Sequence, residues 1–271
     1  MVAVGALLTA EQLSALASRG YPIGLAELDD LTRGLLPEAL WVVFGTSGVG
    51  RTVFACQVAA RAAEAGADTA LVLGREPASV AAANLVCAHA RVADHRLRSG
   101  RLDAREADRS RASAREIAGW PLRVLTPQDP EWEFSKSTSV PGLDHWVAPG
   151  AIPTRRVADV LVVDDLDALT TRPVLDVLCA MRTWARTTGQ AIVVTLPEAP
   201  FVTGGVLSAD VRREADVAVR LCRPDLHNVG SARAGEADLD VLGHRQGPTA
   251  RVVAAFEGHY RRFADLPPPI R

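Results

Sequence analysis

The feature that most constrains the fold of this 271-residue sequence is a glycine-rich turn, GTSGVGRT, at positions 45–52. The turn fits the pattern GxxxxGK[ST] at every defined position except the lysine, where Arg51 stands. It follows an apolar run, 40–45, that predicts a strand, and it opens an alanine-rich stretch, 52–65, that predicts a helix. Glycines allow consecutive backbone N–H groups to surround a phosphate, and the helix N-terminus adds its dipole. The turn therefore predicts a phosphate-binding loop inside an α/β unit.

Two positions of this turn carry the chemistry beyond the backbone. Thr52 has the hydroxyl that holds Mg²⁺ in loops of this kind. Arg51 keeps the positive charge of the usual lysine, but its planar fork is wider than an ammonium group, so precise placement of a terminal phosphate is harder to preserve. Because Lys136 is the only lysine of the chain, general replacement of lysine by arginine is an equally good reading. The expected nucleotide-binding residues are Gly45, Thr46, Ser47, Gly48, Val49, Gly50, Arg51 and Thr52.

The rest of the chain alternates short apolar runs with longer helical patterns. The runs are continuous rather than alternating, as in a parallel sheet covered on both faces, and their spacing predicts right-handed crossovers. Three later runs have little helix between them and predict an antiparallel extension of the sheet. The fold class is therefore α/β, with a mostly parallel central sheet. Strands are predicted at 40–45, 69–73, 122–126, 160–164, 191–195, 216–222, 239–243 and 250–256, and helices at 52–65, 77–92, 103–118 and 173–187.

A second chemical signal is the run VLVVDD at 160–165, an apolar strand that ends in two acids. We interpret Asp164 as the carboxylate that holds the Mg²⁺ water shell beside a bound nucleotide. Asp165 is either a solvated carboxylate at the end of the strand or a base that polarises the attacking water. The pattern is weak alone and gains weight from its place two strand–helix units after the glycine-rich turn.

Composition limits the partners and the compartment. The net charge of -2 gives no overall basic field to attract nucleic acid, so DNA binding is doubtful and would need a local basic groove. The four cysteines, Cys56, Cys87, Cys179 and Cys222, lie far apart in apolar segments and are expected to be buried free thiols. We find no secretory signal at the start and no apolar run of about 20 residues. A soluble, cytoplasmic protein without membrane attachment is expected.

Three segments stand apart from the α/β pattern. Residues 1–20 are expected to form a lead-in helix before a nucleotide-binding domain at 21–265, and 266–271 an extended tail. Residues 127–150 contain four prolines and two tryptophans and show no periodicity, which is typical of a lid or a binding loop. The alternative is a loop that merely packs its tryptophans on the body of the domain.

The two phosphate-site motifs and four flanking segments together resemble the C-terminal motor domain of DnaB-type replicative DNA helicases, which are RecA-like P-loop ATPases. The similarity extends from about residue 20 to 265, nearly the whole chain. The flanking segments are YPIGLAELDDLTRGL at 21–35, RLRSGRL at 96–102, GHRQGPT at 243–249 and the interval from Phe256 to Phe263.

The resemblance implies a homo-oligomer, usually a hexameric ring, with ATP or ADP and Mg²⁺ bound between neighbouring subunits. In that family an arginine at the position of Arg245 enters the site of the next subunit and stabilises charge on the transferred phosphoryl group. A solvated turn residue is the alternative for Arg245.

The departures from the family pattern all lie at positions that have a catalytic, phosphate-sensing or DNA-binding role in the family. Arg75 stands where the family has its catalytic glutamate, and Glu76 is one position late, which turns a strand side chain to the other face. Pro197 replaces a glutamine thought to sense the terminal phosphate, and Gly243 replaces a lysine. The two loops that face DNA in the family are short and poorly basic here, at 170–172 and 201–205.

The sequence thus favours a nucleotide-binding RecA-like protein with weak or lost hydrolysis, acting as an oligomeric scaffold or regulator. The main alternative is an active ATP-dependent DNA helicase or translocase that uses Asp165 or Glu76 as its base. A small-molecule kinase fits less well, because the segment that contains Arg245 is typical of ring ATPases.

Overall fold

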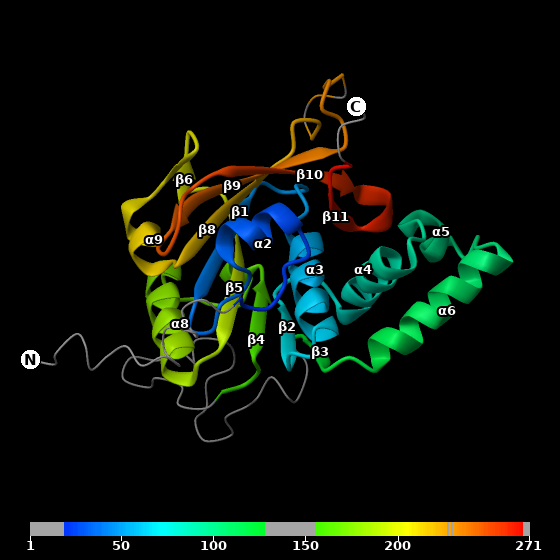
Figure 1. The fold of residues 1–271 in the computed structure, drawn as a ribbon, viewed down its shortest axis with the longest axis horizontal. Helices are drawn as coiled ribbons and strands as arrows, with labels where there is room; N and C mark the ends of the chain where they lie inside the picture. The colour runs from blue at the N-terminus through cyan, green and yellow to red at the C-terminus, as the bar shows by residue number, and fades with distance from the viewer. Residues whose placement is uncertain (1–18, 128–155, 227, 229, 268–271) are drawn as a thin grey trace, which may run out of the picture.

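The computed structural model describes residues 19–127, 156–226, 228 and 230–267. Its main element is a nine-stranded sheet in the order β11-β10-β9-β8-β1-β5-β4-β2-β3 (Figure 1). The strands are β1 (Leu40–Gly45), β2 (Thr69–Leu73), β3 (Leu122–Leu125), β4 (Val160–Asp164), β5 (Ala191–Pro197), β8 (Val217–Cys222), β9 (Glu236–His244), β10 (Arg251–Glu257) and β11 (Arg262–Asp265).

Helices cover both faces of this sheet, and helices α5 and α6 project beyond its β3 edge (Figure 1). The first face carries α2, α3 and α4, and the second carries α8 and α9, as the two separate core clusters indicate. The helices are α2 (Ala26–Thr32), α3 (Arg51–Glu64), α4 (Ala78–Ala90), α5 (Asp94–Ser99), α6 (Ala104–Ala118), α8 (Val174–Thr188) and α9 (Ala209–Glu214), with 3₁₀ turns η3 (Leu166–Ala168) and η4 (Gly258–Tyr260).

The central strand β1 shows why its sequence is apolar throughout. Trp41 and Val43 belong to the core against α3, whereas Val42 and Phe44 belong to the core against α8. All six residues of β1 are buried. A continuous apolar run is therefore what a strand needs when both faces of its sheet are covered.

The strand order confirms the predicted α/β class and corrects one detail of it. We predicted that 216–222 begins the antiparallel extension, but β8 pairs with β1 in parallel. The antiparallel part begins at β9, which pairs with β8 and then with β10. Within the described residues no helix lies between β8 and β9, and this marks the start of the antiparallel part. It does not determine the orientation of β8 against β1.

Other sequence predictions are refined. The segment 201–205 is not a plain loop, because β6 (Val202–Thr203) and β7 (Val206–Leu207) form a small hairpin there. Cys56 and Cys87 are buried free thiols as predicted. The prediction of burial is wrong for Cys179, which is exposed on α8, and only partly right for Cys222, which is half-buried. Most of the predicted lead-in helix, of the loop 127–150 and of the tail lies outside the described residues. Within the described ranges, no helix is long and apolar enough to span a bilayer.

Candidate nucleotide site

The glycine-rich turn connects the carboxyl end of β1 to the first residue of α3, as predicted. Gly48 has φ 78° and Gly50 has φ 111°, backbone conformations that side-chain-bearing residues rarely adopt. A Cβ atom at Gly50 would lie 2.9 Å from the ring of Phe256, so both conformation and space require glycine at this position. The N-terminus of a 14-residue helix therefore opens directly onto the turn, with its dipole directed at any anion bound there.

This turn forms one wall of an open cleft of about 710 Å³. Its volume is within the range of small-molecule sites. The cleft brings together most of the residues singled out from the sequence, although they come from four separate chain segments. Its lining includes Thr46, Ser47, Gly48, Gly50, Arg51, Thr52, Arg75, Glu76, Asp165 and Pro197.

Arg51 does not point freely into the cleft. Its Nη1 donates a short hydrogen bond to the carbonyl oxygen of Gly45. Its Nη2 donates to Oδ1 of Asp165 over 2.7 Å, and both side chains of this pair are largely buried. Nε of Arg51 is buried and has no hydrogen-bond acceptor within the described part of the chain. The guanidinium is thus held over the glycine-rich turn by groups of the protein itself.

Arg75 continues this chain of charges. Its Nη2 lies 2.7 Å from Oδ2 of Asp167, and its Nε lies 3.7 Å from Oδ2 of Asp165. Asp165 therefore has a guanidinium beside each of its carboxylate oxygens. A carboxylate that acts as a base needs a free oxygen directed at the attacking water, and here both oxygens of Asp165 face arginines.

Asp164 has a different environment from its neighbour. Its side chain is buried and accepts hydrogen bonds from the hydroxyls of Thr195 and Thr52. Burial raises the pKa of Asp164 to about 6, although the two hydroxyl hydrogen bonds act in the opposite direction. The two acids at the end of β4 thus have separate surroundings: one contacts hydroxyls and the other contacts guanidinium groups.

Backbone geometry explains how adjacent residues reach different surroundings. Asp165 has φ 52°, in the left-handed region, and its N–H donates to the hydroxyl of Thr195 over 2.8 Å. Gly74 passes so close that a Cβ atom there would lie 2.5 Å from the carbonyl oxygen of Asp165. The close approach of Gly74 and the hydrogen bond to Thr195 together fix the turn that separates the two side chains.

Three further arginines line the cleft, and none of them was singled out from the sequence as a site residue. Arg223 lies over the ring of Phe256, 4.1 Å from its centroid, and its Nη1 donates to the carbonyl oxygen of Gly48. Arg98 and Arg261 reach the cleft from α5 and from the residue after η4, and both pair with Asp94. These residues are distant from the glycine-rich turn in sequence, and no local pattern marked them as site residues.

Pro197 and Glu76, two residues singled out from the sequence, both line the cleft. Pro197 ends β5 directly beside Gly45 in the register of the parallel pair, so the substitution of the sensor residue does fall at the cleft. Glu76 lines the cleft and is exposed, beside the exposed Arg75. Neither position places a carboxylate in the fixed arrangement that Asp164 has.

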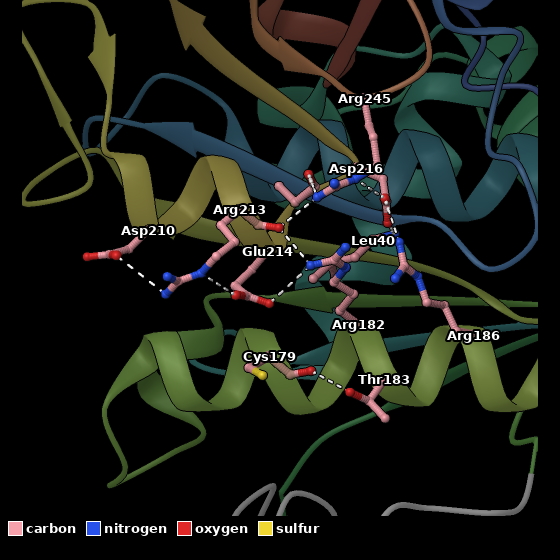
Figure 2. Close-up of polar contacts among 11 residues, drawn as sticks. Leu40, Cys179, Arg182, Thr183, Arg186, Asp210, Arg213, Glu214, Asp216 and Arg245 are labelled. Carbon is pink, nitrogen blue, oxygen red and sulfur yellow. Dashed lines mark hydrogen bonds and ion pairs between the residues drawn. The ribbon is translucent and has the colours of Figure 1, made fainter.

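Arg245 lies elsewhere. It follows β9, whose end pairs with Val217 at the start of β8. Because β8 runs parallel to β1, Arg245 lies at the amino ends of these strands, whereas the glycine-rich turn lies at the carboxyl end of β1. Its Nε donates to Oδ1 of Asp216 over 2.8 Å and its Nη2 donates to the carbonyl oxygen of Arg213 over 2.6 Å (Figure 2). Arg245 is therefore not part of the cleft of its own chain.

The residues present fit a nucleotide and a magnesium ion. Thr52 and Asp164 supply hard oxygen donors, which Mg²⁺ prefers, and Mg²⁺ is commonly held by one or two such groups together with phosphate oxygens. The structure holds no cluster of three or more His, Cys, Asp or Glu side chains able to bind a metal in its described part.

Comparison with known proteins agrees with these observations. Residues 20–133 match the profile of the DnaB-like helicase C-terminal domain. The replicative DNA helicase DnaB of Leifsonia xyli subsp. xyli is 29% identical over 273 residues, which cover 92% of this chain and 56% of the relative. DnaB of Haemophilus influenzae is 25% identical over 91% of this chain and 55% of the relative. The chain therefore spans a little over half the length of these relatives.

Solved structures show the same fold. A DnaB-like replicative helicase, described with its interactions with primase, superposes with a TM-score of 0.78 at 16% identity, covering 98% of this chain and 67% of that one. A separate ATPase domain gives a TM-score of 0.76 at 17% identity and covers 97% of this chain and 98% of that domain. The chain is thus a RecA-like domain that resembles the C-terminal motor domain of DnaB-type replicative helicases.

Proposed function

We propose that this protein binds a nucleoside di- or triphosphate with Mg²⁺ at the glycine-rich turn and hydrolyses it slowly or not at all. The observation that carries the proposal is the contrast within the cleft. The backbone conformation of Gly48 and Gly50 and the oxygen donors of Thr52 and Asp164 are retained. Asp165, the carboxylate that contacts Arg51 of this turn, is instead paired with both Arg51 and Arg75.

The residues have separate roles in this proposal. Backbone N–H groups of the turn and of the start of α3 bind the phosphates. Thr52 and Asp164 hold the Mg²⁺ ion, which neutralises phosphate charge when it is bound. Arg75 is a cation at the place where the resemblance implies a glutamate, and an arginine side chain cannot accept a proton. The chain therefore keeps the groups that bind and lacks the group that activates water.

Such a protein would act through nucleotide-dependent assembly rather than through turnover. By its resemblance to ring helicases we propose a homo-oligomer in which Arg245 of one subunit approaches the cleft of the next. Its role would be that of a scaffold or regulator in a larger complex. A cytoplasmic location is part of this proposal.

The test is a nucleotide titration run beside a turnover assay on the same sample. Thermal unfolding with excess Mg-ADP or Mg-ATP should show stabilisation, since a ligand at about 100 times its dissociation constant adds about 2.7 kcal/mol. Thr52→Val should lose the Mg²⁺-dependent part of that stabilisation. Thr183→Val is a matched control, because Thr183 donates only to a carbonyl within the exposed surface of α8. No stabilisation by any nucleotide at millimolar concentration would overturn the proposal.

The rival function is an active ATP-dependent DNA translocase. The observation in its favour is that Asp165 and Glu76 both line the cleft and are carboxylates. Steady ATP turnover stimulated by single-stranded DNA would favour this rival. If Asp165→Asn then abolished that turnover, Asp165 would be the base and the slow-hydrolysis proposal would be wrong.

A further inference from the structure

We propose that Asp165 is an internal counter-ion that competes with nucleotide phosphate for Arg51, so that it weakens and tunes nucleotide binding instead of acting as a base. This inference rests on the proposed nucleotide binding and adds a specificity-determining role to one residue of that site. Under this inference the cleft favours ligands with a phosphate group, such as a nucleoside di- or triphosphate, because the phosphate oxygens offer Arg51 a replacement for the carboxylate.

The first support is the position of the guanidinium. Nη1 and Nη2 of Arg51 are engaged by the carbonyl oxygen of Gly45 and by Asp165. Gly45 is the first residue of the glycine-rich turn, and a Cβ atom there would lie 3.5 Å from Cγ of Arg51. The side chain thus lies back across its own loop, and a phosphate bound in that loop meets the Arg51–Asp165 pair.

The second support is incomplete satisfaction of Arg51. Its Nε is buried without an acceptor among the residues that the structure describes. A buried donor left without a partner is unfavourable, because it has lost its hydrogen bond to water without gaining another. A phosphate group has three or more acceptor oxygens and can satisfy several donors of one guanidinium at once. Exchange of the carboxylate for a phosphate therefore improves the hydrogen bonding of Arg51.

The third support is that Asp165 does not lose its charge partner when Arg51 leaves. Arg75 has its Nε 3.7 Å from Oδ2 of Asp165, and Arg75 is itself anchored at 2.7 Å by Asp167. A buried carboxylate stripped of all its cations would oppose the exchange strongly. With Arg75 remaining beside it, Asp165 can release Arg51 to a phosphate at a lower cost.

The experiment compares nucleotide affinities of three intact proteins by calorimetry, with ADP as the probe and adenosine as the phosphate-free control. Asp165→Asn should bind ADP about tenfold more tightly than the wild type, a ratio that corresponds to about 1.4 kcal/mol. Its affinity for adenosine should not change. Asp240→Asn is the matched control, because Asp240 is an equally buried carboxylate paired with Arg251 outside the cleft. This control should bind ADP like the wild type.

A general loss of negative charge near the phosphates would also tighten binding, so the cycle is closed with Arg51→Met. If Asp165 acts through Arg51, the tenfold gain from Asp165→Asn should largely disappear in the Arg51→Met background. If Arg51→Met binds ADP too weakly to measure, the same cycle is closed on the unfolding free energy of the ligand-free protein, where the two substitutions must be non-additive.

The outcomes separate the two proposals. Tighter ADP binding by Asp165→Asn, dependent on Arg51, supports the counter-ion role. Equal or weaker binding by this variant, or an equal gain in the Arg51→Met background, overturns it while nucleotide binding by the wild type stands. No ADP binding by the wild type and by Asp165→Asn alike overturns the proposed function itself.

Discussion

The hydroxyl of Thr195 donates a 2.7 Å hydrogen bond to Oδ1 of Asp164 and accepts one of 2.8 Å from the N–H of Asp165. One side chain at the end of β5 therefore fixes both acids at the end of β4. Thr195 is fully buried, so this arrangement is protected from water. It holds Asp164, the carboxylate that we propose binds Mg²⁺, in place while Asp165 turns towards the arginines.

The burial of Asp164 predicts a specific pH dependence of stability. The pKa of this carboxyl is about 6 in the folded protein, against about 3.9 in an unfolded chain. Because the raised pKa means that the fold disfavours the ionised form, the free energy of unfolding decreases as pH rises from about 4 to 6. Asp164→Asn, without nucleotide or Mg²⁺, should be more stable than the wild type by about 3 kcal/mol at pH 7.5. Below pH 4 the two should be equal.

Urea unfolding of both proteins at pH 7.5 and at pH 4 measures this difference. A gap of the same size at both pH values would show that ionisation of Asp164 does not cause it.

Gly50 should tolerate no side chain. Gly50→Ala adds a Cβ atom 2.9 Å from Phe256 at a residue with φ 111°, so steric overlap adds to backbone strain. We expect a loss of about 2–3 kcal/mol in unfolding free energy and a loss of nucleotide binding. Gly100→Ala is the control, because Gly100 also has positive φ but a Cβ atom there meets nothing within 4 Å. Its cost should be about 1 kcal/mol, and equal costs for both variants would refute the steric argument.

Turnover of ATP should increase when Arg51 and Arg75 are replaced by the residues that the family pattern has at these positions. The wild type is expected to hydrolyse ATP near background, because Arg75 provides no proton acceptor. Arg51→Lys combined with Arg75→Glu should raise turnover by roughly 10²-fold, the lower end of what a positioned base contributes. A phosphate-release assay on the double variant and on each single variant measures this. Rapid hydrolysis by the unmodified protein would contradict the prediction directly.

Asp216 should be among the most stabilising charged residues outside the cleft. Its Oδ2 accepts from the backbone N–H of Leu40 over 3.0 Å, and its Oδ1 accepts from Arg245 (Figure 2). Asp216→Ala leaves a buried donor at the start of β1 and a guanidinium without a carboxylate, with an expected loss of about 2–4 kcal/mol. Asp210→Ala removes only an exposed ion pair with Arg213, and it should cost under about 1 kcal/mol. Chemical denaturation measures the unfolding free energy of both variants. Similar losses of unfolding free energy in the two would contradict the prediction.

Single-stranded DNA should bind weakly or not at all. The net charge is -2, and affinity for DNA comes largely from phosphates neutralised by cationic side chains. The hairpin of β6 and β7 has two glycines at its turn and an exposed Val206 in place of basic residues. Fluorescence anisotropy with a labelled oligonucleotide at low salt is the measurement. Submicromolar affinity that falls steeply with salt would disprove the expectation.

Local sequence determined much of this protein. An apolar run, a cluster of glycines and a helical pattern predicted β1, the turn after it and α3, because glycine conformation and helix-terminus chemistry depend on neighbouring residues only. Continuous apolar runs likewise predicted the buried parallel strands. The strand end at Asp164 was predicted for the same reason, since an apolar run must stop where the chain meets polar surroundings.

Only the tertiary structure decided the partners of the charged residues. Arg51 and Asp165 are 114 positions apart, and neither residue type indicates that they form a pair. The parallel orientation of β8, the arrival of Arg223 and Arg261 at the cleft, and the distance of Arg245 from it all depend on strand order. Ion pairs and strand neighbours form between segments that meet only after folding, and their energies depend on burial and geometry that no local pattern contains.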